Sequence, residues 1–152
     1  MFGFGWVTQS KIKRKIVVNN ILTRAIKDFL SKNGFEHFES EKNMGKNCYK
    51  REELYIAIYT RDNDANWAVY EYVYNLAKEG KKVILLLGIL VGKPLKGKLY
   101  KVENKDISKF FEDKDLVRDK YVSISGEKLG DGDTFENKDE LCRCLRTMLE
   151  IE

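Results

Sequence analysis

Potentially reactive side chains are most concentrated in residues 61–71, which read RDNDANWAVYE. This stretch follows an apolar run and precedes a helical pattern, so the sequence predicts a strand-to-helix junction. Glu71 is the candidate for chemistry, because a carboxylate among aromatic side chains can have a raised pKa or hydrogen-bond a sugar hydroxyl. The alternative is an exposed glutamate on an amphipathic helix. The short polar residues of the junction are typical of turns and helix caps: Asp62, Asn63, Asp64 and Asn66.

Trp67 is the second side chain of interest at this junction. It precedes Glu71 by four residues, so a helix over residues 66–79 places both side chains on one face. The junction also follows the C-terminal end of a strand predicted at residues 54–59, which is where open parallel sheets bind ligands. The sequence therefore predicts a candidate site at this edge of the sheet.

The periodicity of the apolar residues predicts alternating helices and strands along the chain. Helices are expected at residues 10–32, 66–79, 106–113 and 137–150. Strands are expected at residues 2–7, 35–39, 54–59, 82–91 and 121–125, and the near-continuous apolar run of residues 82–91 suits a central strand buried on both faces. Asn137 is the expected cap of the last helix, and Gly34 and Gly80 are expected to end the first and second helices. This alternation favours a single α/β domain over residues 1–152, with a mostly parallel sheet and helices on both faces.

The charge of the chain is mildly basic. Its 152 residues carry a net charge of +4, which permits contact with a polyanion without requiring it. Basic residues gather in two groups, and each group is either a phosphate-binding surface or a solvated face. The first group is Lys11, Lys13, Arg14 and Lys15, and the second is Lys93, Lys96, Lys98 and Lys101.

Cysteine usage and hydropathy suggest a cytoplasmic protein that does not enter a membrane. The three cysteines are an odd number, the first residues lack the pattern of a secretory signal, and no segment approaches ~20 apolar residues. His37 is the only histidine, and Cys142 and Cys144 point in different directions on the predicted helix. We therefore expect no metal site.

The segment from residue 53 to residue 91 resembles the middle of a TIR domain. It reads LYIAIYT, then RDNDANWAVYE, then LAKEGKKVILLL. TIR domains have an apolar strand, a polar loop, a helix that opens with Trp followed by Glu four residues later, and a Gly-Lys turn into another buried strand. The resemblance implies a TIR-like or flavodoxin-like sheet. In NADase TIR domains the helix glutamate is the catalytic carboxylate, a role that maps onto Glu71.

This resemblance implies cleavage of the N-glycosidic bond of NAD, with NAD as a substrate and no cofactor, in signalling or defence. A carboxylate beside the ribose would stabilise the oxocarbenium-like transition state. Nucleoside 2-deoxyribosyltransferases share the layout and also act on an N-glycosidic bond. The candidates for stacking on the nicotinamide or base are Trp6, Tyr59 and Trp67, together with Phe4, and a core role is open for each. Arg61 is the candidate for a phosphate.

Two alternatives come from other classes of protein. If residues 48–51 pair with residues 35–39 as a hairpin, the order of elements resembles the restriction-endonuclease-like αβββαβ core. Such nucleases hold a metal with an Asp on the second strand and a Glu-x-Lys on the third, and both are missing from these segments. That resemblance implies a non-catalytic nucleic-acid-binding protein, with Lys11, Lys13, Arg14 and Lys15 contacting phosphate. The other alternative is a protein–protein interaction module that self-associates, as many TIR-like domains do.

Overall fold

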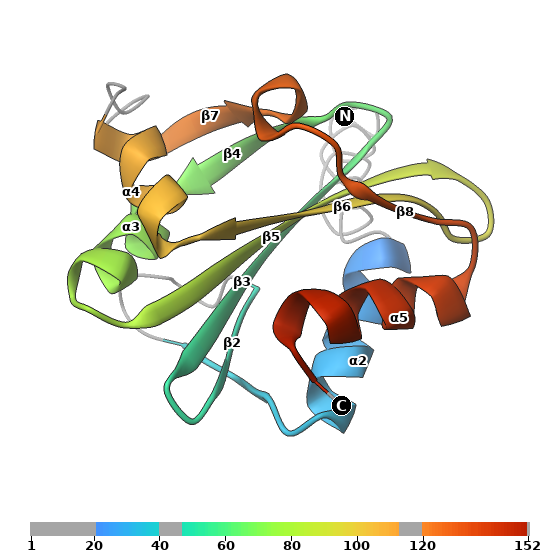
Figure 1. Ribbon diagram of the computed structural model, residues 1–152, viewed down its shortest axis with the longest axis horizontal. Helices are drawn as coiled ribbons and strands as arrows, with labels where there is room; N and C mark the ends of the chain where they lie inside the picture. The colour runs from blue at the N-terminus through green and yellow to red at the C-terminus, as the bar shows by residue number, and fades with distance from the viewer. Residues whose placement is uncertain (1–20, 40–46, 113–119, 152) are drawn as a thin grey trace, which may run out of the picture.

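The computed structural model describes residues 21–39, 47–112 and 120–151, and these residues build a central mixed sheet with helices on both faces (Figure 1). The six-stranded sheet has the order β1-β2-β3-β5-β6-β8, and β4 and β7 form a separate two-stranded sheet. The strands are β1 (Glu36–His37), β2 (Cys48–Arg51), β3 (Leu54–Asp62), β4 (Asn66–Tyr70), β5 (Lys82–Gly92), β6 (Lys96–Glu103), β7 (Tyr121–Ser125) and β8 (Asp133–Phe135). The helices are α2 (Ile21–Lys32), α3 (Glu71–Lys78), α4 (Asn104–Glu112), α5 (Lys138–Leu149) and the 3-10 helix η1 (Gly126–Leu129).

The predicted α/β class and the placement of helices on both faces are confirmed, but the expectation of a mostly parallel sheet is wrong. Only the central pair β3–β5 is parallel, and the other four pairings of the six-stranded sheet are antiparallel. The reason is connection length: β5 turns directly into β6, and tight hairpins join antiparallel strands, whereas a parallel pair needs a crossover. Among the described residues, α3 lies in such a crossover, between β3 and β5.

The N-terminal part of the sheet has the αβββαβ order that the alternative required. Helix α2 is followed by β1, β2 and β3, then by α3 and β5, with β4 inserted between β3 and α3. The hairpin pairing is present, since Glu36 lies opposite Lys50 and His37 opposite Tyr49. Strand β2 in turn pairs with β3 along its whole length. The element order and strand pairing are therefore those of a mixed αβββαβ core.

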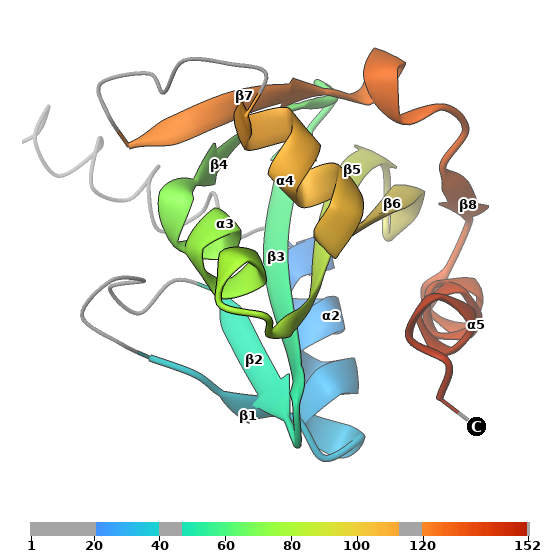
Figure 2. The same cartoon turned by 60° about the vertical axis from the view of Figure 1, so that its left-hand side comes forward.

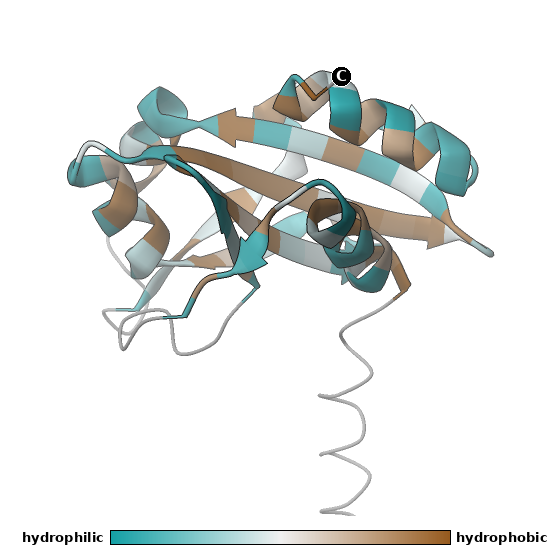
Figure 3. Ribbon diagram, turned by 90° about the horizontal axis from the view of Figure 1, so that it is seen from below, coloured by the Kyte–Doolittle hydropathy of each residue, from teal (hydrophilic) through white to brown (hydrophobic). Residues whose placement is uncertain are grey.

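Two hydrophobic cores lie on opposite faces of the sheet. Helices α2 and α5 cover one face, while α3, α4 and the β4–β7 sheet cover the other (Figure 2). Strand β5 contributes alternate side chains to both cores, as its predicted double-sided burial requires. The covering helices are amphipathic, and α5 beside the C-terminus shows brown and teal sides (Figure 3). Among the described residues, no helix is long and apolar enough to span a membrane.

Residues 66–79 do not form one helix, as the sequence predicted, but a strand followed by a shorter helix. In β4 the side chains of Trp67 and Val69 are buried while Ala68 and Tyr70 are half-buried, which is the period of two of a strand. The aromatic and β-branched residues of β4 pair antiparallel with β7, more than fifty residues later. This long-range pairing overrides the local helical spacing.

Other local predictions are confirmed within the described residues. Asn137 caps α5, because its side-chain oxygen accepts a hydrogen bond from the Glu140 amide at 3.0 Å. Gly34 and Gly80 follow α2 and α3 with φ of 85°, the left-handed conformation that glycine adopts without strain. The strand predicted at residues 2–7 and the first half of the helix predicted at residues 10–32 lie outside the described residues.

Candidate functional site

The indole of Trp67 is a core side chain rather than an exposed stacking surface. Only 1% of Trp67 is exposed, and its Nε1–H donates to the Gly88 carbonyl at 3.0 Å. Its ring packs edge-on against Tyr100 with a centroid separation of 5.6 Å. Burial removes Trp67 from contact with a substrate, so the predicted substrate-binding role has no geometric basis.

Glu71 is the first residue of α3, one residue beyond β4. Its backbone N–H donates to the Lys120 carbonyl at 2.9 Å, and the residue is half-buried. Trp67 and Glu71 do not share a helix face, because Trp67 lies in β4. Trp67 is therefore not a helix neighbour of this carboxylate, whereas Tyr74 of α3 lies close enough to interact electrostatically with it. A catalytic role for Glu71 stays a prediction.

The loop between β3 and β4 is an internally bonded turn, as its residue types indicated. Asn63 adopts φ of 58°, a left-handed conformation that asparagine tolerates, and its N–H donates to the Leu90 carbonyl at 3.1 Å. Arg61 donates to the Asp64 carboxylate at 3.3 Å and to the Asn66 carbonyl at 3.2 Å. Arg61 is thus engaged with its own loop, although its side chain is exposed.

A polar cluster lies beneath α3, on the face of β2 and β3 that points toward that helix. It consists of Cys48 and Tyr72, which are buried, and Tyr59, which is half-buried. The Tyr59 hydroxyl accepts a hydrogen bond from the Tyr70 amide at 3.1 Å. Only 5% of Tyr72 is exposed, and its hydroxyl makes no hydrogen bond of standard geometry with a described residue, although the Tyr59 hydroxyl lies close enough to it to raise its pKa.

Burial holds all three groups of the cluster in their neutral forms. It raises the pKa of the Cys48 thiol to about 12 and raises the pKa of both tyrosines well above their usual range. The neighbouring Tyr59 and Cys48 raise the pKa of Tyr72 further. Neutral phenols and a neutral thiol supply neither a metal ligand nor a nucleophile at pH 7. Tyr59 is half-buried and its hydroxyl is held by the Tyr70 amide, so the substrate contact of Tyr59 stays a prediction.

The second basic group of the sequence does not form one surface. Lys96 pairs with Glu136 at 3.5 Å, whereas Lys101 pairs with Glu103 at 3.0 Å and donates to the Met148 carbonyl at 3.1 Å. Strand alternation puts these two lysines on opposite faces of β6. Lys93 and Lys98 are exposed. Several proposed site residues lie outside the described residues: Phe4, Trp6, Lys11, Lys13, Arg14 and Lys15.

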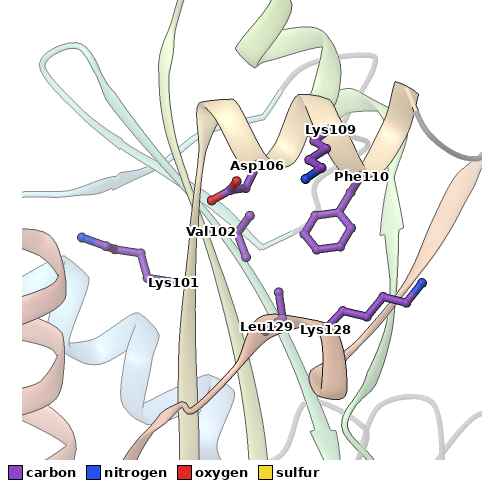
Figure 4. A pocket seen from close by; sticks show the side chains of 7 residues that line it. All are labelled: Lys101, Val102, Asp106, Lys109, Phe110, Lys128 and Leu129. Atoms are coloured by element: carbon purple, nitrogen blue, oxygen red, sulfur yellow. The ribbon is translucent and has the colours of Figure 1, made fainter.

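Described residues line several cavities, and in three of them Glu71 is not part of the lining. One lies between α2 and α5, and another lies beside the β1–β2 hairpin. The third, of about 480 Å³, lies between β6, α4 and η1 and is lined by Lys101, Val102, Asp106, Lys109, Phe110, Lys128 and Leu129 (Figure 4). Sequence reasoning missed this third cavity, because its residues come from three separate segments and no local spacing connects them.

Two comparisons with known proteins found no match. No protein-family model matches the chain, and no curated protein matches it. Within the described residues, no three histidine, cysteine, aspartate or glutamate side chains gather as a metal site. The interpretation of function therefore rests on the mixed sheet, the polar cluster and the lysine-lined cavity.

Proposed function

We propose that this chain is a non-catalytic nucleic-acid-binding protein built on a nuclease-like αβββαβ core. The observation that carries the proposal is the pairing of the sheet, in which β1, β2 and β3 are antiparallel and β5 returns parallel to β3. This mixed pairing supports the nuclease-like alternative over a TIR-like domain, whose sheet is mostly parallel. The NAD-cleaving hypothesis is also weakened by the burial of Trp67.

The side chains of β2 and β3 support a non-catalytic role in this proposal. The second core strand reads CYKR and the third reads LYIAIYTRD, so the third strand has its only acidic residue, Asp62, at its exposed end. On the face beneath α3, Cys48 lies opposite Ala57, and Tyr59 follows two residues later on the same face. A divalent metal of a nuclease requires carboxylate oxygens, which these neutral groups do not provide.

Affinity in this proposal comes from phosphate contacts and is therefore electrostatic. The basic group Lys11, Lys13, Arg14 and Lys15 supplies the sequence-predicted contacts. Releasing the counterions of about four phosphates gives a binding constant that falls roughly 100-fold between 50 and 200 mM salt.

Fluorescence anisotropy with a labelled 20-base-pair duplex tests the proposal. We expect binding at 50 mM salt with the steep salt dependence given above, and no cleavage of the duplex with added Mg²⁺. Replacing the four basic residues with glutamine should flatten the salt dependence. Absence of duplex and single-strand binding at low salt, or metal-dependent cleavage, would contradict the proposal. Release of nicotinamide from NAD, lost on Glu71→Gln, would instead support the TIR-like alternative.

A further inference from the structure

We infer that the cavity between β6, α4 and η1 is a binding site for a single nucleotide, with the base against Phe110 and the phosphate at Lys109 and Lys128. The inference deepens the proposed function. The bound nucleotide is either one unit of a nucleic-acid strand or a free mononucleotide, and only the first case rests on the proposed function.

The size and lining of the cavity suit this ligand. Its volume of about 480 Å³ falls within the roughly 300–1,000 Å³ typical of small-ligand sites. Phe110 contributes an aromatic ring that is half-buried, and Val102 and Leu129 complete an apolar wall beside it (Figure 4). Every nucleobase has a flat π-face, so stacking on such a ring tolerates any base.

The charges around the apolar wall favour an anion. Lys109 and Lys128 reach the cavity from α4 and η1, and neither amine forms an ion pair with a residue that the structure describes. Lys101 also lines the cavity, but its amine points away from it toward α5, where it bonds to Met148 (Figure 4). Asp106 is the single carboxylate among the described residues of the lining, and it can accept a hydrogen bond from an amino or hydroxyl group of the ligand. The Lys109 ammonium lies beside the Phe110 ring, whereas the Lys128 ammonium extends away from it, so a phosphate at the rim of the cavity engages Lys128 once this flexible side chain turns inward (Figure 4).

Helix α4 is held rigidly enough to present its side of the cavity. The Asn104 side chain at its start accepts from the Val83 amide at 2.8 Å and donates to the Lys81 carbonyl at 2.6 Å. Farther along, Ile107 is fully buried and Phe111 stacks on Tyr74 at 5.2 Å. These contacts fix the backbone from which Lys109 and Phe110 project, which lowers the entropy cost of binding.

The opposite wall, η1, is fixed by backbone contacts. The Gly126 amide donates to the Ala65 carbonyl at 2.7 Å, and the Ser125 side chain caps η1 by accepting from the Glu127 amide at 3.3 Å. A Cβ at Gly126 would lie 2.7 Å from the Ala65 Cβ, so glycine permits this close approach. Both walls are therefore set before a ligand arrives.

The test is a ¹H–¹⁵N NMR titration of the full chain with AMP, adenosine and inorganic phosphate as separate probes. We expect AMP to shift the amide resonances around the cavity and to bind more tightly than either of its parts. Lys109→Gln and Lys128→Gln should each weaken AMP binding about fivefold, and Phe110→Leu, which keeps an apolar side chain without the ring, should weaken it by a similar factor. Lys105→Gln is the matched control, since Lys105 is exposed on α4 but does not line the cavity.

The inference is overturned if AMP leaves the cavity resonances unchanged, or if Lys105→Gln weakens AMP binding as much as the cavity variants. Binding of a ten-residue oligodeoxyadenylate identifies the source of the nucleotide. Loss of oligonucleotide affinity in the cavity variants supports a strand, whereas loss of AMP affinity alone supports a free nucleotide. If AMP occupies the cavity while no strand or duplex binds, the proposed function fails and the site stands. If the duplex binds in a salt-sensitive manner while AMP leaves the cavity resonances unchanged, the cavity inference fails and the proposed function stands.

Discussion

The face of the sheet under α2 and α5 buries mainly aliphatic and phenylalanine side chains, whereas the face under α3, α4 and the β4–β7 sheet buries tyrosines, a tryptophan and a thiol. On the first face the buried polar residue Thr23 is satisfied by a hydrogen bond to Thr60. On the second face the Tyr72 hydroxyl makes no hydrogen bond of standard geometry with a described residue. The cavity between β6, α4 and η1 also lies on this second side. The two faces are therefore both packed cores, and they differ in that the second buries more side chains with polar atoms.

The largest effect is expected from removing the Trp67 indole. It belongs to the face under α3, α4 and the β4–β7 sheet, which we call the polar face. Trp67→Ala should lower the free energy of unfolding by about 3–5 kcal/mol, because it empties a large buried volume and removes the donor to the Gly88 carbonyl. Urea denaturation followed by circular dichroism measures the change. Phe135→Ala, which removes a fully buried ring on the opposite face, is the matched control and should cost a similar amount. A loss below 1 kcal/mol for Trp67→Ala would mean that the polar face is not a packed core.

The polar face should also make the protein sensitive to alkali. Burial raises the pKa of Cys48 from 9.0 to about 12, so the folded state keeps a proton that the unfolded state loses. The stability from this group is fully present below pH 9 and falls as the pH rises from 9 toward 12, by up to roughly 4 kcal/mol.

Urea denaturation at pH 8, 9 and 10 measures this alkaline loss. Cys48→Ala keeps the site apolar and removes the titrating thiol. We expect the variant to be less stable at pH 8, but its free energy of unfolding should decline less steeply as the pH rises. An equal decline in both proteins would exclude Cys48 as a source and would leave the tyrosines Tyr59 and Tyr72 as the groups that titrate.

Removing the hydroxyl group should change the free energy of unfolding differently at two neighbouring tyrosines of the polar face. Tyr59→Phe removes the acceptor of the Tyr70 amide and should lower the free energy of unfolding by about 1–2 kcal/mol. Tyr72→Phe removes a buried hydroxyl that makes no hydrogen bond of standard geometry with a described residue and should leave stability unchanged or raise it by about 1 kcal/mol. Thermal and urea denaturation of both variants provide the measurement. A loss in Tyr72→Phe as large as that in Tyr59→Phe would reveal a partner for the Tyr72 hydroxyl.

The smallest effect is expected at Glu71, the residue that the sequence made the leading catalytic candidate. Glu71→Gln keeps the shape of a half-buried side chain at the start of α3 and should change the free energy of unfolding by less than about 0.5 kcal/mol. Duplex binding should stay at the wild-type level. The measurements are urea denaturation and anisotropy, with Glu79→Gln at the end of the same helix as control. A selective loss of ligand binding in Glu71→Gln would return this residue to the functional site.

Sequence reasoning predicted those parts of the fold that depend on neighbours along the chain. The continuous apolar run of β5 required burial on both faces, Asn137 could satisfy the open amides at the start of α5, and Gly80 could adopt the left-handed conformation that ends α3. It did not predict that Trp67 and Val69 would belong to a strand, because their spacing fits either period and only pairing with β7 decides between them.

The sequence by itself therefore determined the α/β class, the doubly buried central strand and the positions of several helix ends, since each follows from local periodicity and backbone preference. The tertiary structure alone decided the direction of the strands, the burial of Trp67 and the cluster of Cys48, Tyr59 and Tyr72. It alone also brought Lys109 and Lys128 to one cavity. The physical reason is that strand pairing and cavity formation join residues tens of positions apart, and their energies depend on contacts that no short window of sequence contains.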